Sequence, residues 1–378
     1  MLLAWYYTDG LKFKSTAIIV CFVGAAGMGL LAQAQRPQMA EDVFKNVQVL
    51  KGIPVDEFMS TMGLFSAALG MSCEDCHASN DSNWANYALD TSVRKQMARK
   101  MVVMMATINK ENFGGRQVVT CYSCHRGSSP PKVTPNLSTL YMSIEEPDDI
   151  IQQARGVPPA DQILDKYLQA VGRGNLTSFI AKGTSVGYGP EGDKRPVEIF
   201  AKAPAQRTTI IHTQNGDKTT TYDGRAAWLS APLRPVPVMA LSGGELEGVK
   251  LEAELSFPSR IKQALTQWRV GFPTTIDDRD VQVVQGNAAG GAFATLYFDA
   301  DSGLLVRMIR YATSAVGRSP TQIDYADYRE VGGIKMPFRS TVTWLDGKET
   351  FELTDVQPNV PIDAAKFAKP APPAPPKR

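Results

Sequence analysis

The sequence predicts a two-part α + β protein, in which an all-α N-terminal module precedes an antiparallel sheet packed on helices. In the first third of the chain, apolar residues recur every three to four positions, which is the period of amphipathic helices. From about Thr177 onward the apolar and polar residues alternate between recurring turns, which is typical of antiparallel strands. The length of 378 residues favours more than one domain, because a domain usually has about 100–200 residues.

The composition is that of an ordinary soluble globular protein. Lys and Arg total 40 and Asp and Glu total 38, so the formal net charge is only +2. A protein that binds nucleic acid through phosphate contacts would show a clear basic excess, and we therefore exclude a nucleic-acid partner. Cys and His are rare, with five and three residues, and four of the Cys and two of the His fall in two pentapeptides.

The N-terminus has the pattern of an export signal. Lys12 and Lys14 precede an apolar run over residues 17–32. The run ends in Ala32-Gln33-Ala34, which has the small residues of a signal-peptidase cleavage site, and Ala34 is the expected last residue of the signal peptide. This order of a positive segment, an apolar segment and an Ala-x-Ala site predicts a signal peptide over residues 1–34. The run is short for a membrane span, which needs about 20 apolar residues. An uncleaved anchor is the alternative, and both interpretations place the protein in the periplasm or on the periplasmic side of the membrane.

Two pentapeptides contain the chemically most specific residues, Cys73-Glu74-Asp75-Cys76-His77 and Cys121-Tyr122-Ser123-Cys124-His125. C-x-x-C-H is the pattern to which c-type haem is attached. Each thiol of the pair bonds one vinyl group of the porphyrin, and the following His lies under the iron as its proximal ligand. We therefore predict two covalently bound c-type haems, with iron ligated by His77 and His125.

Three other interpretations of paired cysteines are less suitable. Zinc ribbons place their two C-x-x-C pairs about 15–20 residues apart, and the two pairs here are much farther apart. A thioredoxin-like dithiol needs one pair in a βαβ context and no adjacent His. Disulfides closed within each pair would be sterically poor at such short spacing.

Methionines on two predicted helices are candidates for the sixth iron ligand. One amphipathic helix is expected over Val55–Leu69 and a longer one over Thr91–Asn109. A Met stripe on a helix more often fills a core than ligates a metal, so spacing leaves several choices open. The candidates are Met59 or Met62 for the first haem, and Met97, Met101, Met104 or Met105 for the second.

Several stretches of this part share a family pattern, namely Val43–Leu50, Ala98–Met101, Ile108-Asn109 and Val119–Gly127. On these stretches, residues from about 40 to 135 resemble half of the cytochrome subunit bound to photosynthetic reaction centres of the purple-bacterial type. In that family each unit is a helix, a turn and the haem motif, and a Met of the helix ligates the haem that follows.

The resemblance implies one axial Met for each haem. Matching the motifs places Met62 on the haem of His77 and Met101 on the haem of His125. The family member with four haems has two further motifs and a His in the loop after the second helix. The corresponding loop here, residues 109–118, has no His, which agrees with a chain that keeps only a dihaem half.

Axial ligation by His and Met predicts an electron carrier and not an enzyme. Both axial positions are filled, so no open site is left for O₂ or peroxide, and Met raises the reduction potential. The expected partner is a membrane-bound or periplasmic redox protein, for which the resemblance names a photosynthetic reaction centre as one candidate. A dihaem peroxidase-like enzyme is the alternative, and it would need one haem that lacks its Met.

The second half is predicted to contain about eight to eleven antiparallel strands. Helices are expected near Ala160–Val171 and Ser259–Trp268, and a Pro/Ala-rich tail ends the chain. Hairpins are expected for Thr208–Thr213 with Lys218–Tyr222, Ala294–Phe298 with Leu304–Tyr311, and Thr321–Arg329 with Met336–Trp344. His212 is expected to be a hydrogen-bonded strand residue and not a haem ligand.

The order of helix and hairpins in this half resembles periplasmic lipoprotein-carrier proteins of the half-barrel type. That resemblance implies a curved sheet closed over helices and an apolar cavity, and hence an alternative function in binding a lipid or another hydrophobic ligand. A docking domain with a solid core is the other possibility. The expected division is a signal peptide (1–34), a dihaem cytochrome c domain (38–136), a linker (137–158), a half-barrel-like domain (159–367) and a disordered tail (368–378).

Overall fold

The computed structural model of the chain describes residues 37–77, 84–131, 151–187, 193–232, 234–288 and 293–373. The expected signal peptide, most of the expected linker and the end of the expected tail lie outside the described residues. Within the ranges just given, every helix is too short or too polar to cross a bilayer.

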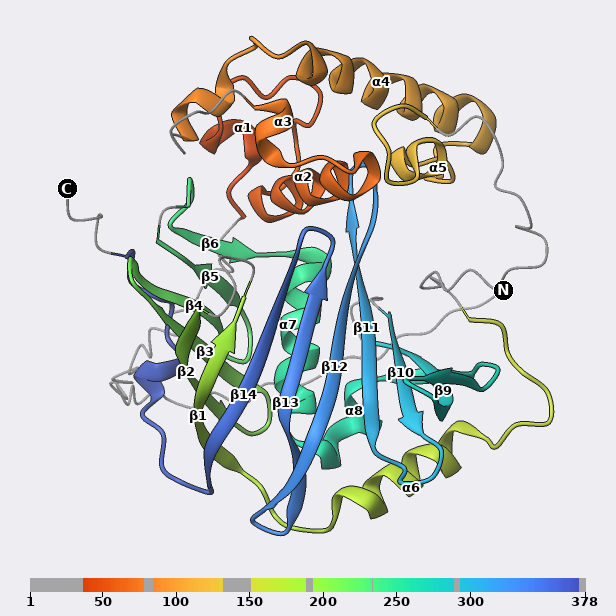
Figure 1. Cartoon of the computed structure of the whole chain (residues 1–378), viewed down its shortest axis with the longest axis vertical. Helices are drawn as coiled ribbons and strands as arrows, with labels where there is room; N and C mark the ends of the chain where they lie inside the picture. Colours follow the sequence, from red (N-terminus) through yellow and green to blue (C-terminus); the bar gives the residue numbers. More distant parts are fainter. Residues whose placement is uncertain are drawn as a thin grey trace, which may run out of the picture. The chain divides into compact units, whose positions relative to one another are not determined.

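The first part of the chain is helical, as the sequence predicts (Figure 1). The expected helix over residues 55–69 is confirmed as α2, and the second helix, α4, begins two residues later and ends four residues later than expected. Both end at a glycine in the left-handed conformation, Gly70 (φ 62°) and Gly114 (φ 60°), which is a common way for helices to stop. The elements are α1 (Ala40–Val43), α2 (Val55–Leu69), α3 (Cys73–Cys76), the 3₁₀ helix η1 (Trp84–Ala88), α4 (Val93–Phe113) and α5 (Cys121–His125).

The remainder forms one antiparallel sheet of fourteen strands, which confirms the expected fold class but exceeds the eight to eleven strands expected. The order is β6-β5-β4-β3-β2-β1-β14-β13-β12-β11-β10-β9-β7, with β8 beside β9, so the sheet is open. The three expected hairpins are present as β3–β4, β10–β11 and β12–β13. The strands are β1 (Ser178–Val186), β2 (Lys194–Lys202), β3 (Gln206–Thr213), β4 (Gly216–Tyr222), β5 (Ala227–Ser230), β6 (Val238–Leu241), β7 (Thr266–Val270), β8 (Thr274–Ile276), β9 (Arg279–Asn287), β10 (Phe293–Asp299), β11 (Leu305–Ser314), β12 (Gly317–Val331), β13 (Ile334–Trp344) and β14 (Gly347–Pro358).

Helices pack on one face of this sheet, with α7 and α8 behind β11–β14 in the view of Figure 1. The expected helix over 259–268 is wrong in its second half, because Thr266–Val270 is strand β7. A helix that the sequence did not suggest, α7, follows Ser242. The helices are α6 (Ala160–Val171), α7 (Gly243–Leu255), η3 (Pro258–Arg260), α8 (Ile261–Ala264) and η4 (Ala364–Phe367). The largest core forms where α6, α7 and α8 meet strands β9 to β12.

The helical part and the sheet share a core at the β11–β12 turn. Val316, at the tip of that hairpin, is 0% exposed and packs among Leu64, Ala68, Val102 and Met105 of the helices. Residues 36–378 accordingly form one compact unit. The domain boundaries given above remain a prediction.

Candidate functional site

The first cysteine pair lies on a helix of a single turn. The Asp75 carboxylate caps that turn by accepting hydrogen bonds from the backbone N (2.8 Å) and the Oγ (2.9 Å) of Ser72. Cys73 and Cys76 are three residues apart on this turn, so their side chains leave the helix on the same side. Both thiols are free, as expected for an attachment motif and not for a disulfide.

His77 follows directly and is held through one ring nitrogen. Its Nδ1 lies 3.0 Å from the carbonyl oxygen of Tyr87, and the two rings stack with centroids 4.7 Å apart. A carbonyl only accepts, so Nδ1 must carry the proton and the lone pair of Nε2 is left for a metal. Burial lowers the pKa of His77, which favours the neutral, ligating form of the ring.

The second motif repeats this arrangement on α5. The Ser123 Oγ accepts a hydrogen bond from the backbone N of Thr120 (3.0 Å), and the Nδ1 of His125 lies 3.1 Å from the carbonyl oxygen of Ser128. The same reasoning therefore leaves the Nε2 of His125 for a metal. The turn after this motif contacts the end of α2, since the N of Gly127 donates to the carbonyl oxygen of Ala68 (2.9 Å).

Three of the four thiols have a raised pKa. Burial raises the pKa of Cys73 and Cys76, and it raises the pKa of Cys121 to about 11. A reactive dithiol has a lowered thiol pKa, so these values disfavour a thioredoxin-like role. Across the described residues, no three His, Cys, Asp or Glu side chains gather as a metal site, so the four cysteines do not form the tetrahedral set of a zinc ribbon.

The structure leaves both candidates for the axial Met open at the first motif. Met59 and Met62 of α2 both line one cavity with Cys73 and His77. On α4 the situation is different, because His125 does not line this cavity. There Met105 is buried in the core, Met101 is half-buried, and Met97 (48%) and Met104 (47%) are exposed.

Basic side chains lie beside the first motif. Lys95 and Arg99 of α4 line the same cavity, and both are mostly buried. Arg99 pairs with Asp90 (2.8 Å), and the Nζ of Lys95 donates to the Tyr87 carbonyl oxygen (2.8 Å) that also contacts His77. An acidic ligand at this motif would therefore meet two cations.

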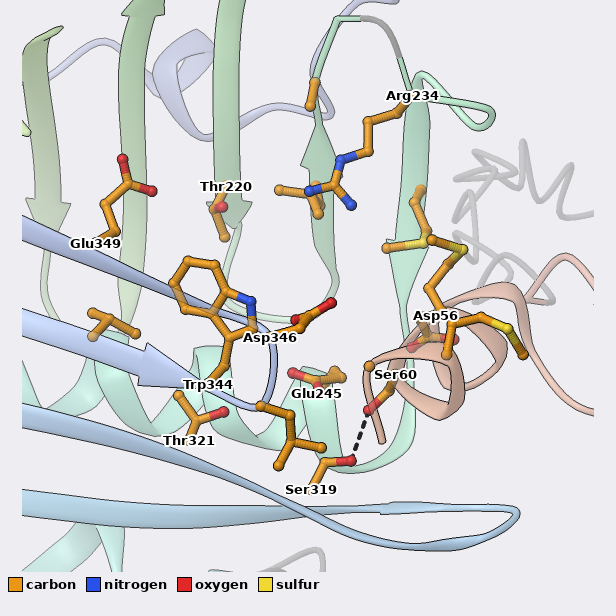
Figure 2. A pocket seen from close by; sticks show the side chains of 18 of the residues that line it. Asp56, Ser60, Thr220, Arg234, Glu245, Ser319, Thr321, Trp344, Asp346 and Glu349 are labelled. Carbon is orange, nitrogen blue, oxygen red and sulfur yellow. Dashed lines mark hydrogen bonds between the residues drawn. The ribbon is translucent and has the colours of Figure 1, made fainter. Parts of the chain in front are cut away.

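The cavity at the first motif extends over the sheet and has a volume of about 1380 Å³. Its walls come from the helical part and from strands on both halves of the sheet. Figure 2 shows Asp56 and Ser60 of α2 facing Ser319 and Trp344, with a hydrogen bond of 3.1 Å between the two serine Oγ atoms. The sequence suggested a cavity only within the second half of the chain. The structure extends that cavity to the first cysteine motif.

Sequence reasoning missed a buried carboxylate on the helical wall of this cavity. Asp56 is 4% exposed and accepts hydrogen bonds from the backbone N and the Oγ (2.9 Å) of Ser242, just before α7. Burial raises its pKa. No local pattern in the sequence indicates that Asp56 and Ser242, which are far apart in the chain, contact each other.

Other polar groups on the wall are paired within the protein. Glu349 is 4% exposed and binds Lys218 (2.8 Å) and Ser185 (2.9 Å). Arg310 binds Glu252 (3.0 Å) and Glu245 (3.4 Å). These pairs satisfy buried charges that the fold would otherwise leave uncompensated.

His212 is the one histidine outside the two motifs. It lies on β3 with its Nδ1 2.8 Å from the carboxylate of Asp217, which confirms the expected hydrogen-bonded strand residue.

Comparisons with known proteins separate the two parts of the chain. Residues 27–147 match the family described as the photosynthetic reaction centre cytochrome C subunit, and residues 221–356 match a family of unknown function. The subunit from Roseobacter denitrificans is 28% identical over 161 residues, which is 38% of this chain and 42% of that protein. The subunit from Thermochromatium tepidum is 35% identical over 97 residues, which is 25% of this chain and 23% of that protein. The chain thus spans less than half the length of these curated relatives.

Solved structures resemble the second part. A LolA superfamily protein from Nitrosomonas europaea is 16% identical with a TM-score of 0.40, covering 56% of this chain and 99% of that one. A putative outer membrane lipoprotein-sorting protein domain from Vibrio parahaemolyticus is 11% identical with a TM-score of 0.40, covering 55% and 95%. The N-terminal part of the chain, over residues 27–147, is thus similar to reaction centre cytochrome c subunits.

Proposed function

We propose that this protein is an electron carrier on the periplasmic side of the membrane, with two covalently bound c-type haems. Cys73 and Cys76 would bond the first haem, and Cys121 and Cys124 the second. The similarity of residues 27–147 to reaction centre cytochrome c subunits supports the class of cofactor. The number of haems and the residues that bind them rest on the geometry of this chain.

The observation that carries the proposal is the matched arrangement of the two histidines. Each comes directly after the second cysteine of its motif, and each has its Nδ1 fixed by a backbone carbonyl oxygen, at 3.0 Å for His77 and 3.1 Å for His125. Such a second contact orients a ligating imidazole and raises its basicity. Finding it at both motifs is hard to explain by chance, because the two loops that supply the carbonyls differ in length and sequence.

The residues at the first motif fit a haem in shape and charge. Apolar side chains of the helical part line the cavity around His77, and Lys95 and Arg99 stand at its side. These cations can pair with the propionates, while the apolar walls exclude water from the ring. When bound, the haem supplies the one-electron couple of its iron, and the chain holds and tunes it.

For the axial ligands we propose Met62 at the first haem and Met101 at the second. Met62 lines the cavity with His77, and Met101 is half-buried on α4. A Met in this position fills the sixth coordination site and raises the reduction potential. Two such haems favour electron transfer over a peroxidase-like reaction, which needs an open coordination site.

The test is a visible spectrum of the mature protein with a pyridine haemochrome count. We expect two c-type haems per chain and the weak near-infrared band of Met–iron ligation. Met62→Ala should turn one haem high-spin, whereas Met59→Ala, one turn away on the same cavity wall, should leave both low-spin. A count of one haem or none would refute the proposal, and a high-spin signal in the unmodified protein would favour the peroxidase-like alternative.

The redox partner we propose is a membrane-bound or periplasmic protein. The relatives are named as subunits of photosynthetic reaction centres, which makes a reaction centre one candidate. Stopped-flow mixing of the reduced protein with isolated reaction centres checks this, because electron transfer at physiological salt would be fast for a true partner and negligible otherwise.

A further inference from the structure

We propose that the cavity binds an isoprenoid quinone beside the first haem site. The inference rests on the proposed function for its redox context, and it adds a second ligand with a site of its own. It comes from the continuity of the cavity, from its size and from the kind of polar groups on its wall.

The cavity is one space with two kinds of wall. At one end it is lined by the first haem motif, including Cys73 and His77, and at the other by strands such as β4 and β12 through Thr220 and Thr321. A molecule held against the strands would therefore share a space with the haem and need no path through protein. This juxtaposition favours a redox-active ligand over a purely structural lipid.

The volume leaves room for such a molecule. Sites for small ligands usually measure about 300–1,000 Å³ and are mostly apolar with a few polar groups. The cavity measures about 1380 Å³, and its strand walls include Ile199, Ile211, Leu229 and Phe351. A long apolar chain fits these walls, because burying it removes apolar surface from water.

The charges near α2 argue against an acidic head group. Asp56 and Asp346 both point into this end of the cavity (Figure 2), and neither has an ion-pair partner among the described residues, so they would repel a fatty acid or a phospholipid phosphate. The wall cation Arg310 is already paired with Glu245 and Glu252. A neutral oxygen-bearing ring suits the same groups better.

A quinone offers both kinds of hydrogen bond that these groups require. Asp56 accepts hydrogen bonds from Ser242 and from the backbone of its own turn, and among the described residues it has no cation within ion-pair distance. Each carboxylate oxygen can accept more than one hydrogen bond, so the group retains acceptor capacity for a ring hydroxyl. Arg234 extends into the same space and can donate to a ring carbonyl oxygen (Figure 2). Charge complementarity therefore selects a quinone or its hydroquinone from among apolar ligands.

The experiment measures binding directly with the full-length, haem-loaded protein. The protein is incubated with decylubiquinone or, separately, with palmitate, passed through gel filtration and extracted, and the ligand retained per chain is quantified. We expect about one decylubiquinone per chain and an upward shift of the melting temperature, with little palmitate retained. More palmitate than quinone would refute the proposal in favour of an acyl-chain site, and retention of neither would refute any ligand of this kind.

Two substitutions on one strand locate the site. Thr220 lines the cavity, whereas its neighbour Thr219 points to the other face of β4. Thr220→Trp should lower retained quinone at least tenfold, and Thr219→Trp should leave it unchanged. Leu229→Trp fills the same space and replaces Thr220→Trp if that variant does not fold. Equal retention by the variants on the two faces would show surface binding and refute the assignment.

The haem count separates this proposal from the function proposed above. Two haems with no bound quinone would refute only the quinone site. Bound quinone on a chain without haem would refute the carrier function and leave the cavity assignment standing.

Discussion

The β11–β12 turn makes a quantitative prediction, because it places one apolar side chain from the sheet inside the core of the helical part. Val316 is 0% exposed and packs against Leu64, Ala68, Val102 and Met105. Val316→Ala removes two buried methyl groups, worth about 1.6 kcal/mol at about 0.8 kcal/mol each. The unfilled space adds a further term, so we expect the free energy of unfolding to fall by about 2–3 kcal/mol.

The assay is urea unfolding of the haem-loaded protein, followed at once by far-ultraviolet circular dichroism and by the haem Soret band. Both signals should shift together, since the substituted side chain belongs to a core that both parts share. Val103→Ala is the matched control, because Val103 lies on α4 and is 54% exposed, and the substitution should change the free energy of unfolding by less than about 0.5 kcal/mol. The reasoning is refuted if the two variants unfold alike, or if the Soret transition is unmoved.

Three other predictions concern charge and backbone conformation. Burial raises the pKa of Asp56 in the folded state above its unfolded value, so the fold loses stability as the pH rises from the unfolded pKa through the folded one. Asp56→Asn should therefore have a higher melting temperature than the unmodified protein at pH 7, and this difference should vanish towards about pH 4. Gly70→Ala should destabilise more than Gly114→Ala in thermal melts. Both glycines have φ near 60°, but only at Gly70 would a Cβ meet backbone, at 2.4 Å, and equal losses would contradict this. Lys218→Met should lower the free energy of unfolding in urea by about 2–3 kcal/mol, because it leaves the buried Glu349 carboxylate without its cation. A loss below about 0.5 kcal/mol would show that the hydrogen bond from Ser185 is enough to stabilise that carboxylate.

Local patterns allowed the helical part to be predicted. The helix at residues 55–69 has its apolar positions at helical spacing and ends at a glycine, and both signals lie within the segment itself. Helix α7 gave no such signal, because Gly243, Gly244 and Gly248 lower its helix propensity and its apolar face is weakly marked. It forms because Leu251 and its neighbours pack on the sheet, which the sequence does not display.

The continuation of the cavity to the first cysteine motif could not be predicted, for a related reason. Its helical wall is fixed by contacts between residues far apart in the chain, such as Asp56 with Ser242 and Ser60 with Ser319. The haem motifs, in contrast, are contiguous, so spacing alone locates their cysteines and histidines. The proposed axial methionines are an intermediate case, because periodicity locates the helix but several Met residues lie on it.

The small core of the helical part explains why haem attachment and packing on the sheet belong together. Among the described residues, the fully buried members of its cluster besides Val316 are Leu50, Leu64, Ala68, Val102 and Met105, and the other apolar side chains packed there are only partly buried. So few buried side chains give a module of this size little stability of its own. Around the second motif, Met104, Val118 and Tyr122 are about half exposed, and a haem bonded to that motif offers the apolar surface that such side chains need. If the chain carries the haems proposed above, they and the β11–β12 turn would both stabilise this module, and losing either one should weaken the binding of the other.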